Sequence, residues 1–393
     1  MGGGKLDYRM TDDQRAIRDS VMDLCGKFPP EYWREGDAKG GFPEDFYRAV
    51  ADNGWLGIAM PEEYGGSNLG ITEAAIMMQA IAECGGGLSA TSAVHMNIFG
   101  LSPVVAFGTE EQKKRMLTPL IKGETKACFA VTEPTTGLNT TKLKTRAVRK
   151  GDTYYVSGQK VWISTAQVAD YMLLIARTTP IEECKSPTDG LTLFYTKLDR
   201  DYVEIREIDK MGRKAVDSNE LFFEELPVPA ADMIGEEGKG FRHILHGMNA
   251  ERVLVSAECV GIGRYALARA AKYANERIVF DRPIGQNQGI QHPLARAWAQ
   301  LEAANHMGFQ AATQYDRGES CGIEANAAKV LASEAAFFAC ERAILTHGGF
   351  GYAKEYDVER LMREVMILRI APISTELVLS NIAEKQLGLP KSY

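Results

Sequence analysis

The stretch "TRAVRKGDTYYVSGQKVWIS", residues 145–164, sets the frame for interpreting the whole chain. β-Branched and aromatic residues lie on both sides of Gly151 and Asp152, which predicts a β-hairpin with its turn at these two residues. Further short β-type runs follow, namely "YMLLIART", "LTLFYT", "YVEIREI" and "ELFFEEL". We therefore expect a central β-domain over residues 126–236.

On either side of this region, apolar residues recur with helical spacing. In residues 1–125, "TDDQRAIRDSVMDLC" begins with a capping box at Thr11 and Gln14, and "TEEQKKRML" begins with another. Between them, "TEAAIMMQAIAE" predicts an apolar helix that ends at the glycines of residues 85–87. Helical patterns return over residues 237–393. The sequence thus predicts a mainly α protein: an N-terminal helical domain, a central β-domain and a C-terminal helical bundle.

Composition excludes several classes of function. The 393 residues carry a formal net charge of -7 without a basic stripe, so nucleic acid is not an expected partner. No basic-then-apolar leader or 18-residue apolar run is present, so we expect no membrane span. The start "MGGGKL" and the end "KSY" match no lipidation or peroxisomal signal. We expect an intracellular, soluble protein of the cytoplasm or of a mitochondrial or peroxisomal matrix.

The cysteines give the same indication, because no two have the spacing of a metal site or a CxxC pair, which fits a reduced compartment. They are Cys25, Cys84, Cys128, Cys184, Cys259, Cys321 and Cys340.

Two patterns suggest cofactor sites but have simpler explanations. "GIGRYA", residues 261–266, matches a dinucleotide fingerprint, but it lies within a helical stripe instead of following a strand, so close helix packing is the better interpretation. His243 and His246 lack a third ligand in their neighbourhood, so we expect packing or solvent roles and no metal site.

Four segments together resemble the acyl-CoA dehydrogenase family, and the resemblance covers nearly the whole chain. They are "CFAVTEPTTGLN" (128–139), "GQKVWIS" (158–164), "ERIVFDRPIGQNQGIQ" (276–291) and "THGGFGYAKEYDVERLMRE" (346–364). The resemblance implies the order of domains predicted above. It also implies FAD-dependent α,β-dehydrogenation of an acyl-CoA thioester, within fatty acid or amino acid catabolism. Such chemistry needs an oriented flavin, donors for the thioester oxygen and a carboxylate base.

The resemblance assigns two groups of residues to FAD. Those expected along the isoalloxazine ring are Phe129, Val131, Thr132, Trp162, Ile163 and Ser164. Those expected at the rest of the cofactor are Arg277, Phe280, Gln288, Leu345, Gly348, Gly349 and Ser374. Arg277, Phe280 and Gln288 would reach the pyrophosphate and adenosine from a neighbouring subunit, which implies a homo-oligomer, commonly a dimer of dimers in this family. Taken alone, Trp162 is equally compatible with a core position, and Arg277 with an exposed ion pair.

The base is expected at an unusual place. Most relatives carry the catalytic glutamate near the C-terminus, where this chain has Pro372 in "RIAPISTEL". A subset, including the isovaleryl-CoA and long-chain enzymes, supplies it from a Glu-Arg pair on the bundle helix, which corresponds here to Glu251 and Arg252. Glu251 is therefore the candidate base, although an acid in a first helical turn also suits the helix dipole. Glu376 is the rival carboxylate.

Other positions concern the substrate. Asn249, Arg252 and Leu138 are expected to contact it, although Leu138 stands where relatives often have a serine at the CoA arm. Pro372 lacks the backbone N–H that relatives use to hold the thioester oxygen, so Ile373 is the substitute donor considered. "AVHMNIF" places His95, Met96 and Asn97 at the bottom of the acyl pocket, which favours a short, branched or polar acyl group.

Three functions remain open from the sequence. The first is an acyl-CoA dehydrogenase that passes electrons to an electron-transfer flavoprotein. The second is a flavoprotein of the same fold with oxidase, monooxygenase or desulfinase-like chemistry, which Pro372 keeps in consideration. The third is a helical scaffold that has lost its flavin, which the intact "TEP", "VWIS" and "RPIGQNQ" segments disfavour.

Overall fold

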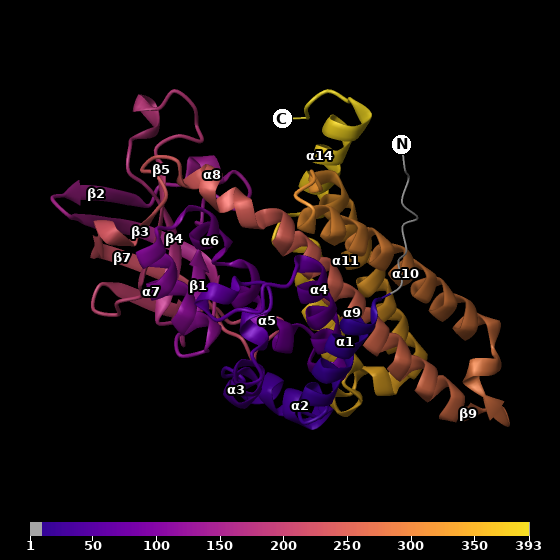
Figure 1. The fold of residues 1–393 in the computed structure, drawn as a ribbon. Coiled ribbons are helices and arrows are strands. Elements are labelled where there is room, and N and C mark those ends of the chain that lie inside the picture. Colours follow the sequence, from indigo (N-terminus) through magenta and orange to yellow (C-terminus); the bar gives the residue numbers. More distant parts are fainter. Residues whose placement is uncertain (1–9, 393) are drawn as a thin grey trace. The chain divides into compact units, whose positions relative to one another are not determined.

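The computed structural model describes residues 10–392, so the opening "MGGGKL" and Tyr393 lie outside the described residues. The chain divides into two compact units (Figure 1). The first comprises the described residues up to Arg34, Gly70–Thr91 and the residues from Ala250 onward; the second comprises Glu35–Leu69 and Ser92–Asn249. As predicted, helices precede and follow a single large sheet.

The second unit contains that sheet. Its strands run in the order β6-β7-β3-β2-β4-β5-β8, and β1 pairs with β4 in parallel. The predicted hairpin is confirmed, because Lys150 on one strand pairs with Thr153 on the next. The strands are β1 (Ala127–Ala130), β2 (Arg146–Lys150), β3 (Thr153–Ser164), β4 (Tyr171–Arg177), β5 (Leu191–Lys197), β6 (Val203–Glu207), β7 (Ser218–Pro229) and β8 (Met233–Ile234).

Strand β4 is buried on both faces, which explains its continuous apolar sequence. Met172 and Leu174 belong to one core, whereas Leu173 and Ile175 belong to another that also contains Leu117. Helices cover the face of the sheet that carries Leu173 and Ile175. This covering holds the residues that follow β1 and β3 in place. The helices of this unit include α3 (Glu44–Asp52), α6 (Ser102–Phe107), α7 (Glu110–Ile121) and α8 (Gly240–Ile244).

The first unit is built on three long helices that pack around one alanine-rich core (Figure 1). They are α9 (Met248–Glu276), α10 (Gln288–Asp316) and α11 (Gly322–His347). The shorter helices include α1 (Asp12–Cys25), α4 (Ile71–Ile81), α12 (Val358–Val365), α13 (Ile367–Ile370) and α14 (Thr375–Leu387). Helices α2 (Pro30–Lys39) and α5 (Gly87–Phe99) begin in this unit and end in the second one.

The glycines of "GIGRYA" lie inside α9 and serve helix packing. A Cβ atom at Gly261 would lie 2.4 Å from the Gln79 carbonyl oxygen, and one at Gly263 would lie 2.6 Å from the Leu301 side chain. The backbones therefore approach more closely than any larger residue allows. This confirms the packing interpretation over the dinucleotide fingerprint.

As predicted, the chain leaves the α-helical conformation at the glycines of residues 85–87, because Gly85 and Gly87 both have positive φ. A π-helical turn, Ala82–Gly86, follows α4, and α5 begins directly at Gly87. Gly85 has a φ of 99°, which accommodates the kink without a Cβ clash. The three glycines thus bend and restart the helix.

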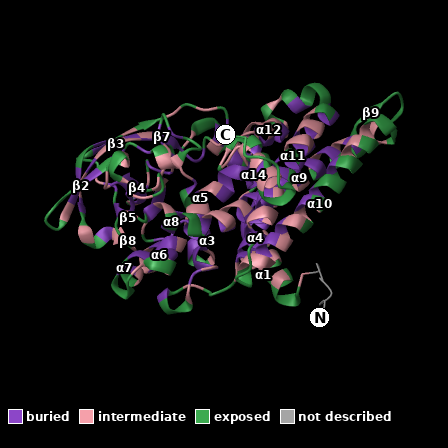
Figure 2. Ribbon diagram, turned by 90° about the horizontal axis from the view of Figure 1, so that it is seen from above, coloured by how far each residue is buried: buried purple, intermediate pink, exposed green. Residues whose placement is uncertain are grey.

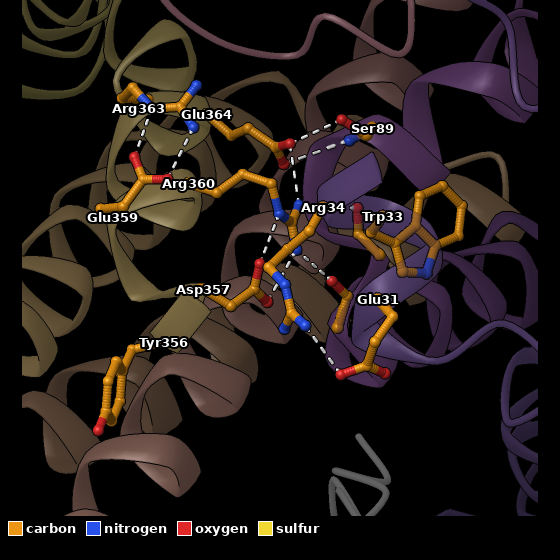
Figure 3. A network of polar contacts seen from close by, with 12 residues as sticks. Glu31, Trp33, Arg34, Ser89, Tyr356, Asp357, Glu359, Arg360, Arg363 and Glu364 are labelled. Atoms are coloured by element: carbon orange, nitrogen blue, oxygen red, sulfur yellow. Dashed lines mark hydrogen bonds and ion pairs between the residues drawn. The ribbon is translucent and has the colours of Figure 1, made fainter. Parts of the chain in front are cut away.

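A buried ionic network holds this kink (Figure 3). The guanidinium of Arg360 pairs with Asp357 at 2.8 Å and with Glu364 at 3.0 Å, and it donates to the Gly85 carbonyl oxygen at 2.6 Å. Glu364 also accepts the Leu88 backbone N–H at 2.8 Å. The carboxylate therefore satisfies backbone groups at the N-terminus of α5, where the helix dipole favours negative charge.

A small hairpin joins α9 to α10. Strand β9 (Ile278–Val279) pairs with β10 (Arg282–Pro283), and Phe280 and Asp281 between them both have positive φ. Two positive φ values are the signature of a type I′ turn. Figure 2 colours the hairpin mostly as exposed.

The helical stretch Ile71–Phe107 contains a window apolar enough to cross a membrane by length and composition, with a mean hydropathy of 1.3. Within the fold 61% of that window is buried, as in the core helix of a globular protein. The bent pair Val358–Ile370 and Thr375–Leu387 also passes the test when taken together. Both are weak indications of a span.

Candidate active site

Strand β3 presents Trp162 to the outside by breaking its register. The pairing of β3 with β7 shifts between Lys160 and Ile163, and Trp162 itself has a φ of 61°. Trp162 is consequently 57% exposed, although its chain neighbours Val161 and Ile163 are both buried. Positive φ in a bulky residue costs about 1–3 kcal/mol and is concentrated at functional sites. The bulge therefore leaves the Trp162 side chain exposed on a strained stretch of backbone.

The segment after β1 lies against the same bulge. The Val161 backbone N–H donates to the Thr132 carbonyl oxygen at 2.9 Å, and Lys160 Nζ donates to the Val131 carbonyl oxygen at 2.9 Å. Phe129, at the end of β1, packs at 5.8 Å from the Phe99 ring. The structure thus places Val131 and Thr132 beside the bulge of β3 that carries Trp162.

Lys160 is entirely buried beneath this surface. Its ammonium group lies 3.0 Å from the Glu133 carboxylate, which also accepts the backbone N–H groups of Lys144 and Thr145. Burial lowers the pKa of Lys160 to about 8, and Glu133 opposes that shift. Burial alone would raise the pKa of Glu133, but Lys160 and these hydrogen bonds outweigh it and lower the value.

Ser164 and Ile163 have different surroundings at the end of β3. The Ile163 side chain is buried in the core, and its carbonyl oxygen accepts from Asn219 Nδ2 at 2.9 Å. Any contact of Ile163 with a cofactor would therefore use backbone atoms. The Ser164 hydroxyl is half-buried and accepts a hydrogen bond from Arg213 at 2.9 Å. Leu138 lies in the loop after β1 and is 50% exposed.

Glu251 lies in the first turn of α9, half-buried, and Asn249 precedes it on the same turn. Arg252 follows it. Burial lowers the pKa of the Arg252 guanidinium, and the Glu251 carboxylate opposes that shift. The carboxylate therefore acts electrostatically on a poorly solvated arginine, a more specific environment than that of an ordinary acid on a helix surface.

The C-terminal segment offers no second base of this kind. Pro372 occupies the position between α13 and α14, and the Glu376 side chain is an exposed acid in the first turn of α14. Ser374 caps α14, with its hydroxyl oxygen accepting the Leu377 N–H at 3.3 Å. Its assignment to the cofactor thus competes with a capping role.

Lys329 on α11 holds the segment between α13 and α14 through a hydrogen bond to its backbone. Its fully buried ammonium group donates to the Ile373 carbonyl oxygen at 2.8 Å, and burial lowers the pKa of the amine. The carbonyl of Ile373 is thereby held toward the bundle core. This contact constrains the orientation of the residue that was considered as the substitute donor for the thioester oxygen.

The remaining cofactor positions gather at one end of the bundle. The Arg277 guanidinium lies 5.8 Å from the centroid of the Phe350 ring, which links the end of α9 to the turn after α11. Phe280 is 93% exposed and Leu345 is 56% exposed. Gln288 is exposed at the start of α10. These side chains project outward, as residues that bind a group on another molecule would.

The two glycines after α11 leave open space at that end. Gly348 has a φ of 62°, and a Cβ atom built on Gly348 or Gly349 meets no atom within 4 Å. Nearby, Tyr273 stacks on His347 with 4.3 Å between ring centroids. The space beside the glycines is what the close approach of a cofactor phosphate requires.

The residues predicted at the acyl pocket are partly used by the fold. Met96 and Asn97 line a cavity of about 10 Å³, room for about one water molecule. Asn97 Nδ2 donates to the Tyr47 hydroxyl and to the Leu120 carbonyl oxygen, each at 3.3 Å. The His95 ring packs at 4.8 Å from the Phe99 ring.

The histidine pair has a packing role, as expected. His243 and His246 both contact the Phe107 ring, at 4.5 Å and 5.5 Å between centroids. Burial lowers the pKa of His243. Over residues 10–392, no group of three or more potential metal ligands comes together.

These surroundings fit FAD. An exposed, strained tryptophan suits a flat ring system, and an exposed arginine near two glycines suits a pyrophosphate. The sequence interpretation missed three groups that support this site: the Lys160–Glu133 pair, Arg213 and Lys329. Lys160 in "GQKVWIS" and Lys329 in the apolar helical run "ANAAKVLAS" were the available signals, since each is a lysine among apolar neighbours; Arg213 lies in a loop without such a pattern.

The comparison with known families decides the assignment. Models of the N-terminal, middle and C-terminal domains of acyl-CoA dehydrogenases match residues 11–124, 128–226 and 238–387. The chain belongs to the acyl-CoA dehydrogenase family. It is a flavoprotein oxidoreductase with the acyl-CoA dehydrogenase fold.

Individual acyl-CoA dehydrogenases and relatives match over their full length. The acyl-CoA dehydrogenase fadE12 of Mycobacterium bovis is 34% identical over 398 residues, with 98% of each chain covered. The butyryl-CoA dehydrogenase structure from Megasphaera elsdenii aligns with a TM-score of 0.92 and 29% identity, over 97% of this chain and 100% of that one. The prolyl acyl carrier protein oxidase AnaB aligns with a TM-score of 0.91 and 28% identity over the same shares.

Proposed function

We propose that this enzyme removes hydrogen from the α and β carbons of an acyl-CoA thioester, with Glu251 as the base. The observation that carries the proposal is the contrast between two carboxylates. Glu251 lies half-buried beside the poorly solvated Arg252, whereas Glu376 is exposed to solvent. Pro372 cannot accept a proton. Under this proposal, the enzyme belongs to the subset of the family whose base lies on the bundle helix.

In the proposed site, the residues of β1 and β3 hold the flavin ring. Phe129, Val131, Thr132 and Trp162 form the surface that supports this, and the outward Ser164 hydroxyl completes it. When bound, FAD supplies the acceptor for the hydride that leaves the β carbon. Glu251 takes the α proton, so that the proton and the hydride leave neighbouring carbons and a double bond forms between them.

The thioester oxygen needs a donor other than residue 372. Proline has no N–H, and the neighbouring Ile373 keeps its N–H while Lys329 holds its carbonyl oxygen at 2.8 Å. We assign the backbone N–H of Ile373 to this role. Preorganised donors of this kind are worth about 100-fold or more in rate.

The acyl group that suits these surroundings is short or branched. The Asn97 amide nitrogen already donates to the Tyr47 hydroxyl and to the Leu120 carbonyl oxygen. It is therefore a poor recognition group for a polar acyl tail. Met96 lines the same small cavity. Asn249, Arg252 and Leu138 are the proposed contacts of the remaining substrate, with Leu138 giving an apolar contact at the CoA arm.

A second copy of the chain completes FAD binding in this proposal. Arg277, Phe280 and Gln288 project from the end of the bundle, and an aromatic side chain that is 93% exposed is costly to leave in water. Leu345, Gly348, Gly349 and Ser374 are the other residues proposed at this part of FAD. An electron-transfer flavoprotein is the proposed acceptor of the electrons.

A second candidate function is an oxidase-type reaction on the same fold. Pro372 favours it, because the usual C-terminal glutamate and its backbone donor are both replaced. AnaB, which is named an oxidase, shows that the fold supports such chemistry. Monooxygenase and desulfinase-like reactions belong to the same alternative.

Anaerobic titration of the FAD-loaded enzyme with a panel of acyl-CoAs separates the candidates. We expect one short or branched acyl-CoA to bleach the flavin absorbance without oxygen, which identifies dehydrogenation and the substrate together. Full FAD occupancy without bleaching by any acyl-CoA would contradict dehydrogenation and favour the second candidate.

A further inference from the structure

Arg213 gathers three serine hydroxyls at the edge of the proposed flavin surface. Its guanidinium donates to Ser92 Oγ at 3.1 Å through Nη1, and to Ser164 Oγ at 2.9 Å and Ser218 Oγ at 3.1 Å through Nη2. The residue lies in the loop between β6 and β7 and has a φ of 59°. A positive φ in a long side chain is uncommon and marks a position that the surroundings impose.

Arg213 acts as a clamp, meaning that its guanidinium hydrogen-bonds to the ends of two neighbouring strands. Ser164 ends β3 and Ser218 begins β7, and these two serines face each other as cross-strand partners. Because one nitrogen of the rigid guanidinium reaches both hydroxyls, the fork fixes the spacing of the strands at this point. Arg213 is half-buried, and Ser218 is buried.

The clamp also determines the direction in which the Ser164 hydroxyl can donate its hydrogen. A serine hydroxyl has one hydrogen and two lone pairs, whereas an arginine only donates. Ser164 therefore accepts from Arg213, and its own hydrogen is left to be donated elsewhere. The adjacent Trp162 surface is where the flavin ring is proposed to lie.

We propose that Arg213 is a positioning residue that sets the reduction potential of the flavin, by orienting the Ser164 hydroxyl as a donor and by adding positive charge at that ring edge. The inference rests on the proposed function in that it takes the ring to lie against Trp162 and Ser164. It names a residue outside the segments that carry the family resemblance.

The physical reason is charge. A bound flavin ring gains negative charge when it accepts a hydride, and a nearby cation favours that form. Arginine stays protonated at every accessible pH, so its contribution does not titrate. Lysine keeps the charge but presents a point cation instead of a fork, so it cannot hold Ser92, Ser164 and Ser218 together.

The test measures the midpoint potential of the FAD-loaded enzyme by reduction in the presence of reference dyes, without acyl-CoA. Arg213→Met is expected to shift the reduction equilibrium toward the oxidised form at least tenfold, which for a two-electron couple is about 30 mV. Arg213→Lys should recover most of that shift. Arg206→Met is the matched control: Arg206 is on β6, exposed and paired with Glu204, so its potential should equal that of the wild type.

A wild-type potential in Arg213→Met with full FAD occupancy would overturn the proposal. Arg213→Gln also removes the positive charge, but its side-chain amide can still hydrogen-bond to the serine hydroxyls. Loss of FAD from both neutral variants would also overturn it, since the residue would then hold the domain together instead of tuning the flavin. Because no acyl-CoA is present, an enzyme that fails to oxidise any acyl-CoA still gives a clear result here.

Discussion

At the scale of single residues, the buried pair of Lys160 and Glu133 lies beneath the proposed flavin surface. A charged amine inside a sheet is strongly unfavourable unless it is paired and hydrogen-bonded. Here the ammonium group meets Glu133 at 3.0 Å and the Val131 carbonyl oxygen at 2.9 Å. The pair thereby ties the segment after β1 to β3.

Removing only the lysine should be strongly destabilising. Lys160→Met leaves the Glu133 carboxylate buried without its cation, so we expect a loss of about 3–5 kcal/mol in the free energy of unfolding. The double variant Lys160→Met with Glu133→Gln should recover part of that loss, since the neutral amide leaves no buried charge and its oxygen still accepts the backbone N–H groups of Lys144 and Thr145. Urea unfolding of the two variants and the wild type measures these losses. Equal losses in the single and double variants would show that the ion pair is not the cause.

The same pair predicts a pH dependence. The unfolded chain holds the lysine proton up to about pH 10.4, whereas burial lowers the pKa in the folded state to about 8. Between these values the unfolded state binds more protons, so the free energy of unfolding should rise with pH, relative to the double variant. The stabilisation that comes from deprotonated Lys160 is lost as the pH falls through the folded-state pKa of about 8. A flat difference between pH 8 and 10.4 would contradict the lowered pKa.

At the scale of elements, helix packing depends on glycines that allow close backbone approach. Gly261→Ala would place a Cβ atom 2.4 Å from the Gln79 carbonyl oxygen, a backbone atom that cannot yield easily. Overpacking of this kind costs about 1–3 kcal/mol or more. Gly289→Ala on α10 is the matched control, because its Cβ meets no atom within 4 Å and alanine favours the helix by up to about 1 kcal/mol. Thermal unfolding that ranks the two variants in the opposite order would exclude close packing as the role of Gly261.

Elements with local chemical signals were predictable from the sequence. The capping boxes at Thr11 and Thr109 form as expected, because both partners lie within four residues. The hairpin at Gly151 and Asp152 follows from a two-residue turn between β runs. The hairpin at Phe280 was missed because its positive φ values fall on residues that rarely adopt them.

Site features that depend on distant partners could not be predicted. Lys160 is buried because Glu133 lies beside it, and nothing in "GQKVWIS" alone shows that contact. Arg213 reaches Ser92 and Ser164 only after the loop and strands have folded. The flavin-ring residues are proposed from family resemblance, and the strained bulge that exposes Trp162 could not be predicted from the sequence.

At the scale of the whole molecule, the proposed assembly joins cofactor retention to oligomeric state. Arg277→Ala removes paired contacts to pyrophosphate and should weaken FAD retention on dilution. Phe280→Asp places a charge on a side chain that is 93% exposed in the single chain but buried in the proposed assembly, so both the oligomer and the cofactor should be lost.

Mass photometry and flavin absorbance on the same samples test this link. Tyr202→Asp, at an exposed aromatic residue beside β6, is the control and should change neither the mass nor the flavin content. An unchanged mass and full FAD occupancy in Phe280→Asp would show that this end of the bundle does not bind a second copy.

The most direct test of the account is the rate of flavin reduction by the bleaching acyl-CoA in two matched variants. Glu251→Gln keeps size and hydrogen-bonding capacity but cannot accept the α proton, so it should retain FAD and acyl-CoA binding and reduce the flavin at least about 100-fold more slowly. Glu376→Gln, at the exposed acid of α14, should stay within a few-fold of the wild type. Rapid-mixing absorbance under anaerobic conditions gives both rates. A fast Glu251→Gln with a slow Glu376→Gln would contradict the account and move the base to the C-terminal segment.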